Sequence, residues 1–234
     1  MCTVTYHPYE KGFILTSNRD EAPHRSPTSI STLTGPDGQT LYLPKDTGGG
    51  SWIVASSSGR CACLLNGGFE LHRSKGPYKR SRGLVVLDSF AYSSIADFWD
   101  HYDWEGIEPF TLIHLDEGKV FEGRWDGHRY WLTKKDATQP HLWASATLYD
   151  ADQRAERAGW FRDQLCYFEV QTPQTLREFH LTGGNGDRKN DLVMQRPEGV
   201  QTVSISQLTL NDDGLAMRYD HLLDGQTHHV KIIG

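Results

Sequence analysis

Short runs of strand-forming residues, separated by turn residues, dominate the first half of this sequence. Residues 2–6 and 13–17 flank a turn-like stretch at 7–12 and predict a β-hairpin. Residues 52–56 and 61–65 predict a second hairpin, with a Ser-Ser-Gly-Arg connection at 57–60. Neither a strand–helix–strand rhythm nor a glycine-rich phosphate fingerprint is present. The pattern therefore argues against a doubly wound fold and predicts an α+β protein with antiparallel sheets.

Helices are expected at a few places between the strands. Ser81 is suited to cap a helix over the apolar run 81–90, and Ser93 or Ser94 is suited to cap one that includes residues 95–99. A longer helix is expected over 150–168, where Ala155, Ala158, Trp160, Phe161 and Leu165 would form a broad apolar side opposite Arg and Glu residues. A shorter helix is expected from Thr172-Pro173 to about 181. Further strands are expected at 110–115, 119–125, 130–133, 142–146, 203–210, 215–223 and 228–233.

Length, charge and cysteine usage narrow the function classes. No repeat divides the 234 residues, so one domain over 1–234 is expected. A net charge of −6 without a basic arm disfavours nucleic-acid binding, and no apolar run is long enough to predict a membrane span. No secretory signal is evident, and the four cysteines suggest neither a disulfide framework nor a zinc site, so a cytoplasmic location is expected. A small-molecule substrate or ligand is the expected partner. No cofactor is predicted, and the oligomeric state is left open.

Cys2 is the most specific chemical feature of the sequence. Removal of Met1 would make it the first residue, with the thiol as nucleophile and the α-amine as a base within reach. The α-amine has an ordinary pKa of about 8, which suits that role. The alternative is a Cys that stands second by chance, and position alone favours this alternative. If Met1 is retained, the α-amine is part of a peptide bond and cannot act as a base.

Two polar segments at the ends of predicted strands strengthen the case for Cys2. The apolar strand 13–17 leads directly into Asn18-Arg19-Asp20-Glu21, where Arg19 could lower the thiol pKa and Asp20 could orient the α-amine. Asn66 follows the strand 61–65, and its side-chain amide could donate to a developing oxyanion. The alternatives are a solvated turn closed by an Arg–Asp pair and an ordinary Asn-Gly turn.

Several motifs in order resemble those of the NRDE-motif family, the homologues of transport and Golgi organisation protein 2. They are Met1-Cys2, the Ser-Asn-Arg-Asp-Glu run at 17–21, Gly-Gly-Ser-Trp-Ile at 49–53, Leu65-Asn66 and Ser81-Arg82-Gly83. The resemblance is specific to about residue 90 and looser beyond, where residues 144–150 and a hairpin at 203–219 are also similar. That family in turn resembles N-terminal-nucleophile (Ntn) hydrolases of the choloylglycine hydrolase and penicillin V acylase type.

The resemblance implies an αββα sandwich that hydrolyses a non-peptide C–N amide bond. By this resemblance Cys2 would be the nucleophile, Arg19 its electrostatic partner, Asp20 the group that holds the amine, and Asn66 one oxyanion donor. The sequence departs from the family pattern at two positions. Ala146 stands where an Asn is favoured, and Gly199 stands where an Arg is usual, with Arg196 or Arg188 as candidate replacements.

A second class of function remains open on the same scaffold. The departures at Ala146 and Gly199 favour a non-catalytic binding or trafficking protein for haem, lipid or another amphiphilic anion, whereas Cys2, Arg19 and Asp20 favour the enzyme. The basic run His72-Arg73-Ser74-Lys75, with Lys79, Arg80 and Arg82, could receive an anionic ligand such as a phosphate or carboxylate. A solvated loop is the more common role of such a run.

Overall fold

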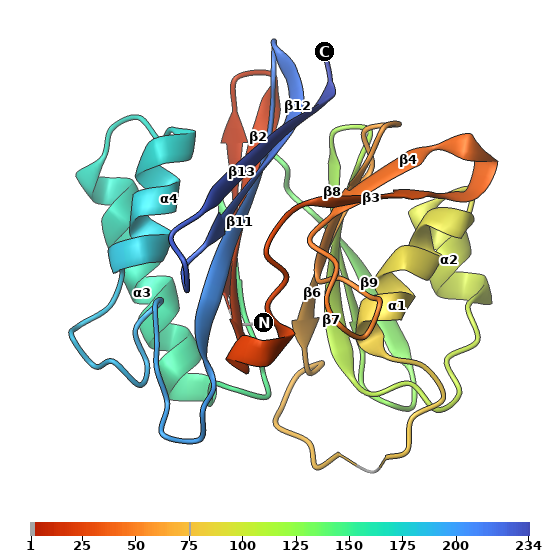
Figure 1. Ribbon diagram of the computed structural model, residues 1–234, viewed down its shortest axis with the longest axis horizontal. Helices are drawn as coiled ribbons and strands as arrows, with labels where there is room; N and C mark the ends of the chain where they lie inside the picture. Colours follow the sequence, from red (N-terminus) through yellow and green to blue (C-terminus); the bar gives the residue numbers. More distant parts are fainter. Residues whose placement is uncertain (1–2, 75) are drawn as a thin grey trace.

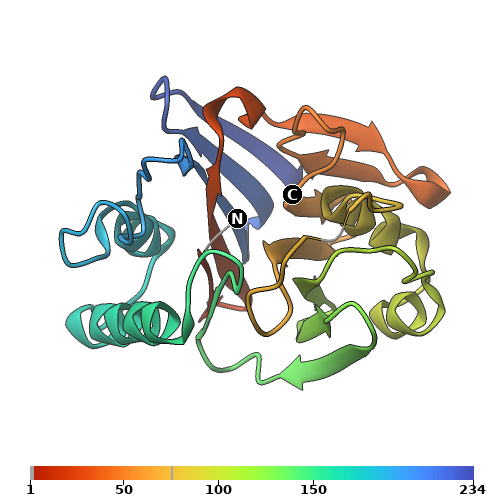
Figure 2. The same ribbon diagram turned by 90° about the horizontal axis from the view of Figure 1, so that it is seen from below.

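The chain folds into four layers in the order helices, sheet, sheet, helices (Figure 1). The computed structural model describes residues 3–74 and 76–234. Helices α3 (Ala151–Tyr167) and α4 (Pro173–Thr182) cover one sheet, and α1 (Arg82–Asp88) and α2 (Ile95–His101) cover the other. Figure 2 shows the same order of layers from below. Every pairing between the named strands is antiparallel, which confirms the α+β class and the αββα sandwich.

Each sheet is built largely from hairpins. The first sheet has the strand order β10-β1-β2-β11-β12-β13, and the second runs β3-β4-β5-β6-β7-β8-β9. The strands of the first sheet are β1 (Thr3–Tyr9), β2 (Gly12–Glu21), β10 (His141–Ala144), β11 (Gln201–Asn211), β12 (Gly214–His221) and β13 (Thr227–Ile233). Those of the second are β3 (Ser31–Thr34), β4 (Thr40–Leu43), β5 (Ile53–Ser56), β6 (Cys61–Asn66), β7 (Phe110–Asp116), β8 (Lys119–Trp125) and β9 (Tyr130–Lys135). Short 3-10 turns are found at Pro23–Arg25, Pro36–Gly38 and Ser89–Ala91.

Most of the predicted elements are present, and the differences have local causes. The first hairpin turns at Glu10 and Lys11, with Glu10 at a φ of 51°, so residues 7–9 and 12 are strand and not turn. Strands β3 and β4 were not predicted from the sequence. They are only four residues long and flank a Gly-Pro-Asp-Gly turn, which masks their alternation.

The predicted apolar side of α3 is wrong in part. Ala155 is exposed, whereas Arg157 and Phe161 are the buried residues of this helix. The Arg157 guanidinium lies 3.5 Å from the centre of the Tyr149 ring and donates to Thr3 Oγ1 and to two backbone carbonyls. A buried cation is tolerated here because Nε and Nη2 have acceptors and an aromatic face covers the guanidinium, although Nη1 has no hydrogen-bond partner among the described residues.

Two apolar cores hold the layers together. The larger one fills the space between the sheets, with Val4, Leu15 and Trp52, and continues between the second sheet and helices α1 and α2, with Val86 and Phe98. The smaller one lies between the first sheet and helices α3 and α4, and its members are Ile14, Phe161, Leu176, Phe179 and Leu192. Successive residues of a strand point to opposite faces, so Ile14 and Leu15 enter different cores. No helix in the described part of the chain is long and apolar enough to cross a membrane.

Candidate active site

Strand β2 divides the Asn-Arg-Asp-Glu motif between its two faces. Arg19 points into the space between the sheets, where its guanidinium carbon lies 4.1 Å from the centre of the Trp52 ring. Asn18 and Asp20, its neighbours in sequence, contact groups on the helix-covered side of the sheet. This separation follows from the two-residue period of a strand. The four residues therefore do not form one cluster.

Arg19 is the centre of a buried charge network. Its side chain is only 3% exposed, and Nη2 lies 3.0 Å from Asp46 Oδ2 and 3.4 Å from Glu21 Oε2. Arg25 contacts the same two carboxylates, at 2.8 Å from Asp46 and 3.0 Å from Glu21. Burial lowers the pKa of the Arg19 guanidinium, and the neighbouring Glu21 and Asp46 carboxylates oppose that shift. The network holds the positively charged guanidinium of Arg19 in place at the end of β2.

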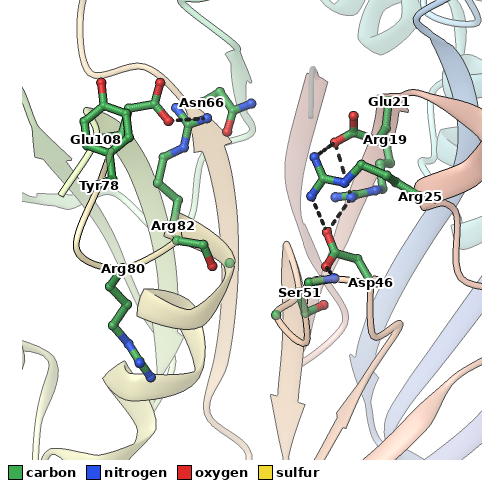
Figure 3. A pocket seen from close by; sticks show the side chains of 14 residues that line it. Arg19, Glu21, Arg25, Asp46, Ser51, Asn66, Tyr78, Arg80, Arg82 and Glu108 are labelled. Atoms are coloured by element: carbon green, nitrogen blue, oxygen red, sulfur yellow. Dashed lines mark hydrogen bonds and ion pairs between the residues drawn. The ribbon is translucent and has the colours of Figure 1, made fainter. Parts of the chain in front are cut away.

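A cavity of about 350 Å³ opens between this network and the end of β6 (Figure 3). One wall carries Arg19, Glu21, Arg25 and Asp46, and the opposite wall carries Asn66, Tyr78, Arg82 and Glu108. Arg80 also contributes to the lining, but its guanidinium is turned away and pairs with Asp88. The volume lies at the lower end of the range for small-molecule sites.

Asn66 has an orientation that leaves hydrogen-bonding capacity within the cavity. Its backbone carbonyl accepts from Ser145 Oγ at 2.9 Å, which holds the end of β6 against the segment after β10. Its Oδ1 atom is buried and has no hydrogen-bond partner among the described residues. A buried acceptor without a partner is costly in a folded protein, so a ligand that donates a hydrogen bond to this oxygen would offset that cost. The structure thus brings Arg19 and Asn66 to one cavity.

Asp20 lies outside that cavity lining, in a separate buried cluster. Tyr149 Oη donates to its Oδ2 atom at 2.9 Å, and Thr202 Oγ1 donates to its Oδ1 atom at 2.5 Å. Arg157 and Arg196 lie over the Tyr149 ring, at 3.5 and 5.5 Å from its centre. The carboxylate of Asp20 is therefore held in a fixed orientation by groups from two distant parts of the chain.

Asn18 joins the sheet to helix α4. Its Nδ2 donates to the carbonyls of His180 and Leu192, at 3.0 and 2.7 Å, and His180 Nδ1 contacts its Oδ1. The other ring nitrogen of His180 lies 2.7 Å from Thr5 Oγ1. Burial lowers the pKa of His180 to about 3, so the ring is neutral and donates from one nitrogen only. Asn18 is a structural residue that locks α4 onto β1 and β2.

The remaining member of the predicted site, Cys2, lies outside the described residues. Of the other cysteines, Cys61 and Cys63 are buried in the core and Cys166 is exposed. Burial raises the pKa of the Cys63 thiol to about 12, so this sulfur stays protonated and is a poor nucleophile. Among the described residues, no group of three or more His, Cys, Asp and Glu side chains is placed to hold a metal ion.

Charged cavity residues that were not predicted as part of the site include Arg25, Asp46, Arg82 and Glu108. Arg25 and Asp46 lie in connections whose sequence has no motif of its own. Asp46 does precede the run Gly48-Gly49-Gly50, and a side chain at Gly50 would collide with the Gly83 backbone at 2.5 Å. This contact brings the loop of Asp46 to the start of α1, where Arg82 lies. Arg82 belongs to the basic run, and its partner Glu108 has no distinguishing sequence context.

The two departures from the family pattern lie away from the cavity lining. Ala146 is buried beside Gly67, where an added side-chain carbon would meet Ala146 Cβ at 3.0 Å. Gly199 is in a turn with a φ of 85°. Arg196 donates to the carbonyl of Leu148 and stacks over Tyr149, so it acts next to Asp20 and not in the cavity of Arg19.

Comparisons with known proteins agree with this architecture. Residues 1–150 match the family described as Transport and Golgi organisation 2. No curated protein matches the sequence significantly. Penicillin V acylase from Agrobacterium tumefaciens is similar in structure, with a TM-score of 0.58, 9% sequence identity and coverage of 99% of this chain and 86% of that one. A mutant conjugated bile acid hydrolase from Clostridium perfringens has a TM-score of 0.56, 10% identity and coverage of 99% and 92%. Identities this low support the Ntn-hydrolase fold alone.

Proposed function

This chain belongs to the Transport and Golgi organisation 2 family, and on that basis we propose that it is an N-terminal cysteine hydrolase that cleaves a non-peptide C–N amide bond. The chain has the fold of Ntn hydrolases, and two of its structural neighbours are an acylase and a hydrolase by name. Fold alone does not assign chemistry, so the proposal depends on the site.

One observation carries the proposal: Arg19 and Asn66 line the same cavity, although they come from different sheets. Cys2 is bonded to Thr3, the first residue of β1, and β1 pairs with β2 in the register Val4 to Ser17. Arg19 lies two residues beyond Ser17 on β2. The residue proposed as nucleophile thus directly precedes, in sequence, the strand that pairs with the one supplying the guanidinium.

In the proposed reaction, Cys2 Sγ attacks the carbonyl carbon of the amide while the α-amine takes the thiol proton. The oxyanion that forms accepts hydrogen bonds from the Asn66 amide and from backbone N–H groups. Collapse of this intermediate breaks the C–N bond, and the proton passes to the departing nitrogen. A water molecule, deprotonated by the α-amine, then hydrolyses the thioester and regenerates the thiol. Asp20 holds the α-amine in this scheme, and Arg19 stabilises the thiolate.

Thiol reactivity tests the site without knowledge of the substrate. Intact mass first establishes whether Met1 is removed. Iodoacetamide labelling of the Cys2 peptide is then followed against pH in a Cys166→Ser background, because Cys166 is the exposed thiol of the described residues. A nearby guanidinium lowers a thiol pKa by about 1–3 units, and Arg19→Gln is expected to reverse that shift. Retention of Met1 in the native host, or labelling no faster than a free thiol, would contradict the proposal.

Turnover is tested by release of free amine from a panel of amides. Cys2→Ala is expected to abolish release, and Asn66→Ala to reduce it by about 10²–10³ if Asn66 is an oxyanion donor.

A second cavity favours the alternative, a binding function on the same scaffold. This cavity of about 610 Å³ lies at the hairpin turns β1–β2, β5–β6 and β7–β8. Its walls include the apolar side chains of Tyr6, Phe13, Leu115, Val120 and Leu210, and Lys11 and Lys119 also line it. Glu10, Asp116 and Glu117 line the cavity as well, and Lys11 and Lys119 pair with Asp212 and Glu117. The apolar walls would suit an amphiphile such as haem or a fatty acyl compound, whereas the rim carries charges of both signs. Titration followed by absorbance or calorimetry, with Phe13→Asp as the blocking variant, tests this alternative.

A further inference from the structure

No aliphatic side chain is among the lining residues described for the candidate active-site cavity. Half of its lining residues are Arg, Asp or Glu, and Tyr78 is the one aromatic residue among the lining residues described. A ligand with a large apolar part would displace water from these charged groups without replacing their hydrogen bonds, at a substantial cost in free energy. The lining therefore favours a polar ligand, and the volume of about 350 Å³ favours a small one.

The arginines on the two walls differ in the number of carboxylates that they contact. Arg19 and Arg25 each contact two carboxylates, those of Glu21 and Asp46. On the opposite wall Arg82 has one carboxylate within ion-pair distance among the described residues, Glu108 at 3.0 Å. His72 Nε2 lies 3.1 Å from the other oxygen of Glu108, so Glu108 is shared with a second cation whenever His72 is protonated. Arg82 therefore has the fewest carboxylate contacts of these three arginines.

Arg82 also has hydrogen-bond donors to spare. A guanidinium group carries five N–H donors. Arg82 uses Nη2 for Glu108, and Nη1 donates to the Pro109 carbonyl at 3.1 Å; no other partner occurs among the described residues. Its side chain is 17% exposed, so its remaining donors are poorly hydrated. Figure 3 shows Arg82 and Glu108 on the wall that carries Asn66. An acceptor-rich anion bound there would lie beside the proposed oxyanion donor.

We propose that the substrate is a small amide with a carboxylate near the bond to be cleaved, and that Arg82 binds this carboxylate. This inference rests on the proposed function for the identity of the reacting bond. The carboxylate would accept hydrogen bonds from the unused N–H groups of Arg82, in the charge-assisted geometry that guanidinium groups favour. Short N-acyl amino acids are the simplest compounds of this class. Arg82 is then the residue that selects the substrate.

The test compares N-acetylglycine with its neutral methylamide, two probes of similar size that differ in one charge. Protection of Cys2 from iodoacetamide in the Cys166→Ser background measures binding at the site. The thermal shift caused by each probe measures the same preference without a reagent at Cys2. The carboxylate probe is expected to bind at least about tenfold more tightly, the effect of a charge-assisted hydrogen bond. Release of glycine measures turnover separately.

Arg82→Gln is expected to remove the preference for the carboxylate, and Arg82→Lys to keep part of it. Arg80→Gln is the matched control, because Arg80 is two residues away and its guanidinium pairs with Asp88 outside the cavity. If Arg82→Gln does not fold, the comparison of the two probes on the unaltered protein still tests whether the site prefers a carboxylate.

Three outcomes are informative. Equal binding of the two probes, or binding of neither at millimolar concentration, overturns the inference. A preference that Arg82→Gln does not change also overturns it. A carboxylate preference that depends on Arg82, together with no cleavage of any amide, supports the anion site and removes the hydrolase proposal.

Discussion

Replacing Asp46 by Asn isolates the charge network that holds Arg19. The change keeps the size of the side chain and the Oδ1 acceptor for the Gly48 N–H, which lies at 2.7 Å. It removes the negative charge that lies 3.0 Å from Arg19 and 2.8 Å from Arg25. Arg19 is 3% exposed and would keep only Glu21, at 3.4 Å, as a carboxylate partner within ion-pair distance among the described residues.

The expected loss of stability follows from these distances and exposures. Breaking a fully buried ion pair by removing one partner costs about 3–5 kcal/mol, because the remaining charge is left buried. Glu21 remains and Arg25 is 42% exposed, so the Arg25 contact contributes little and we expect a net loss of about 2–3 kcal/mol.

Urea denaturation followed by tryptophan fluorescence measures the effect as a lower midpoint at unchanged slope. Glu117→Gln is the matched control, because it breaks an ion pair with Lys119 at 2.9 Å in which Glu117 is 77% exposed. That control is expected to unfold like the unaltered protein. A loss below about 0.5 kcal/mol for Asp46→Asn, the size expected of an exposed ion pair, would refute the argument that Arg19 depends on this carboxylate.

Three further changes test other buried groups. Burial is the main cause that lowers the pKa of His114 to about 3, so between pH 6.5 and 3 the unfolded chain binds a proton that the folded chain excludes, and stability falls as the pH falls. In His114→Phe, the free energy of unfolding from urea titrations at several pH values is expected to depend less steeply on pH, by about 1.4 kcal/mol per pH unit. An unchanged dependence on pH would contradict this prediction. Asn18→Ala leaves the carbonyl of His180 without its donor, and we expect the free energy of unfolding to fall by about 2–3 kcal/mol with little change in Cys2 labelling. A decrease no larger than that of a surface substitution would argue against the proposed link between helix α4 and the sheet. Tyr149→Phe removes one of the donors to Asp20, with an expected loss of about 1 kcal/mol and an altered pH profile of Cys2 labelling. A profile identical to that of the unaltered protein would separate Asp20 from the reactive centre.

Local sequence patterns determined most of the secondary structure and part of the site. The hairpins at β5–β6 and β7–β8 follow from short apolar runs bounded by Gly, Ser and Asp, and α2 and α3 begin at the caps Ser94 and Asp150. Both signals are local in the sequence, so they can be read without the fold. Arg19 and Asn66 were identifiable in the same way, because each is a polar residue at the end of a buried strand.

Only the tertiary structure decided which polar groups meet. Arg19 and Asp20 are adjacent in sequence but face different layers, because a strand turns successive side chains to opposite sides. Asp46 reaches the cavity of Arg19 from a loop and Arg82 reaches it from the first turn of α1, and Tyr149 reaches Asp20 from 129 residues away. Contacts at such separations depend on how the sheets and helices pack, and this packing is a property of the whole chain that no short segment encodes.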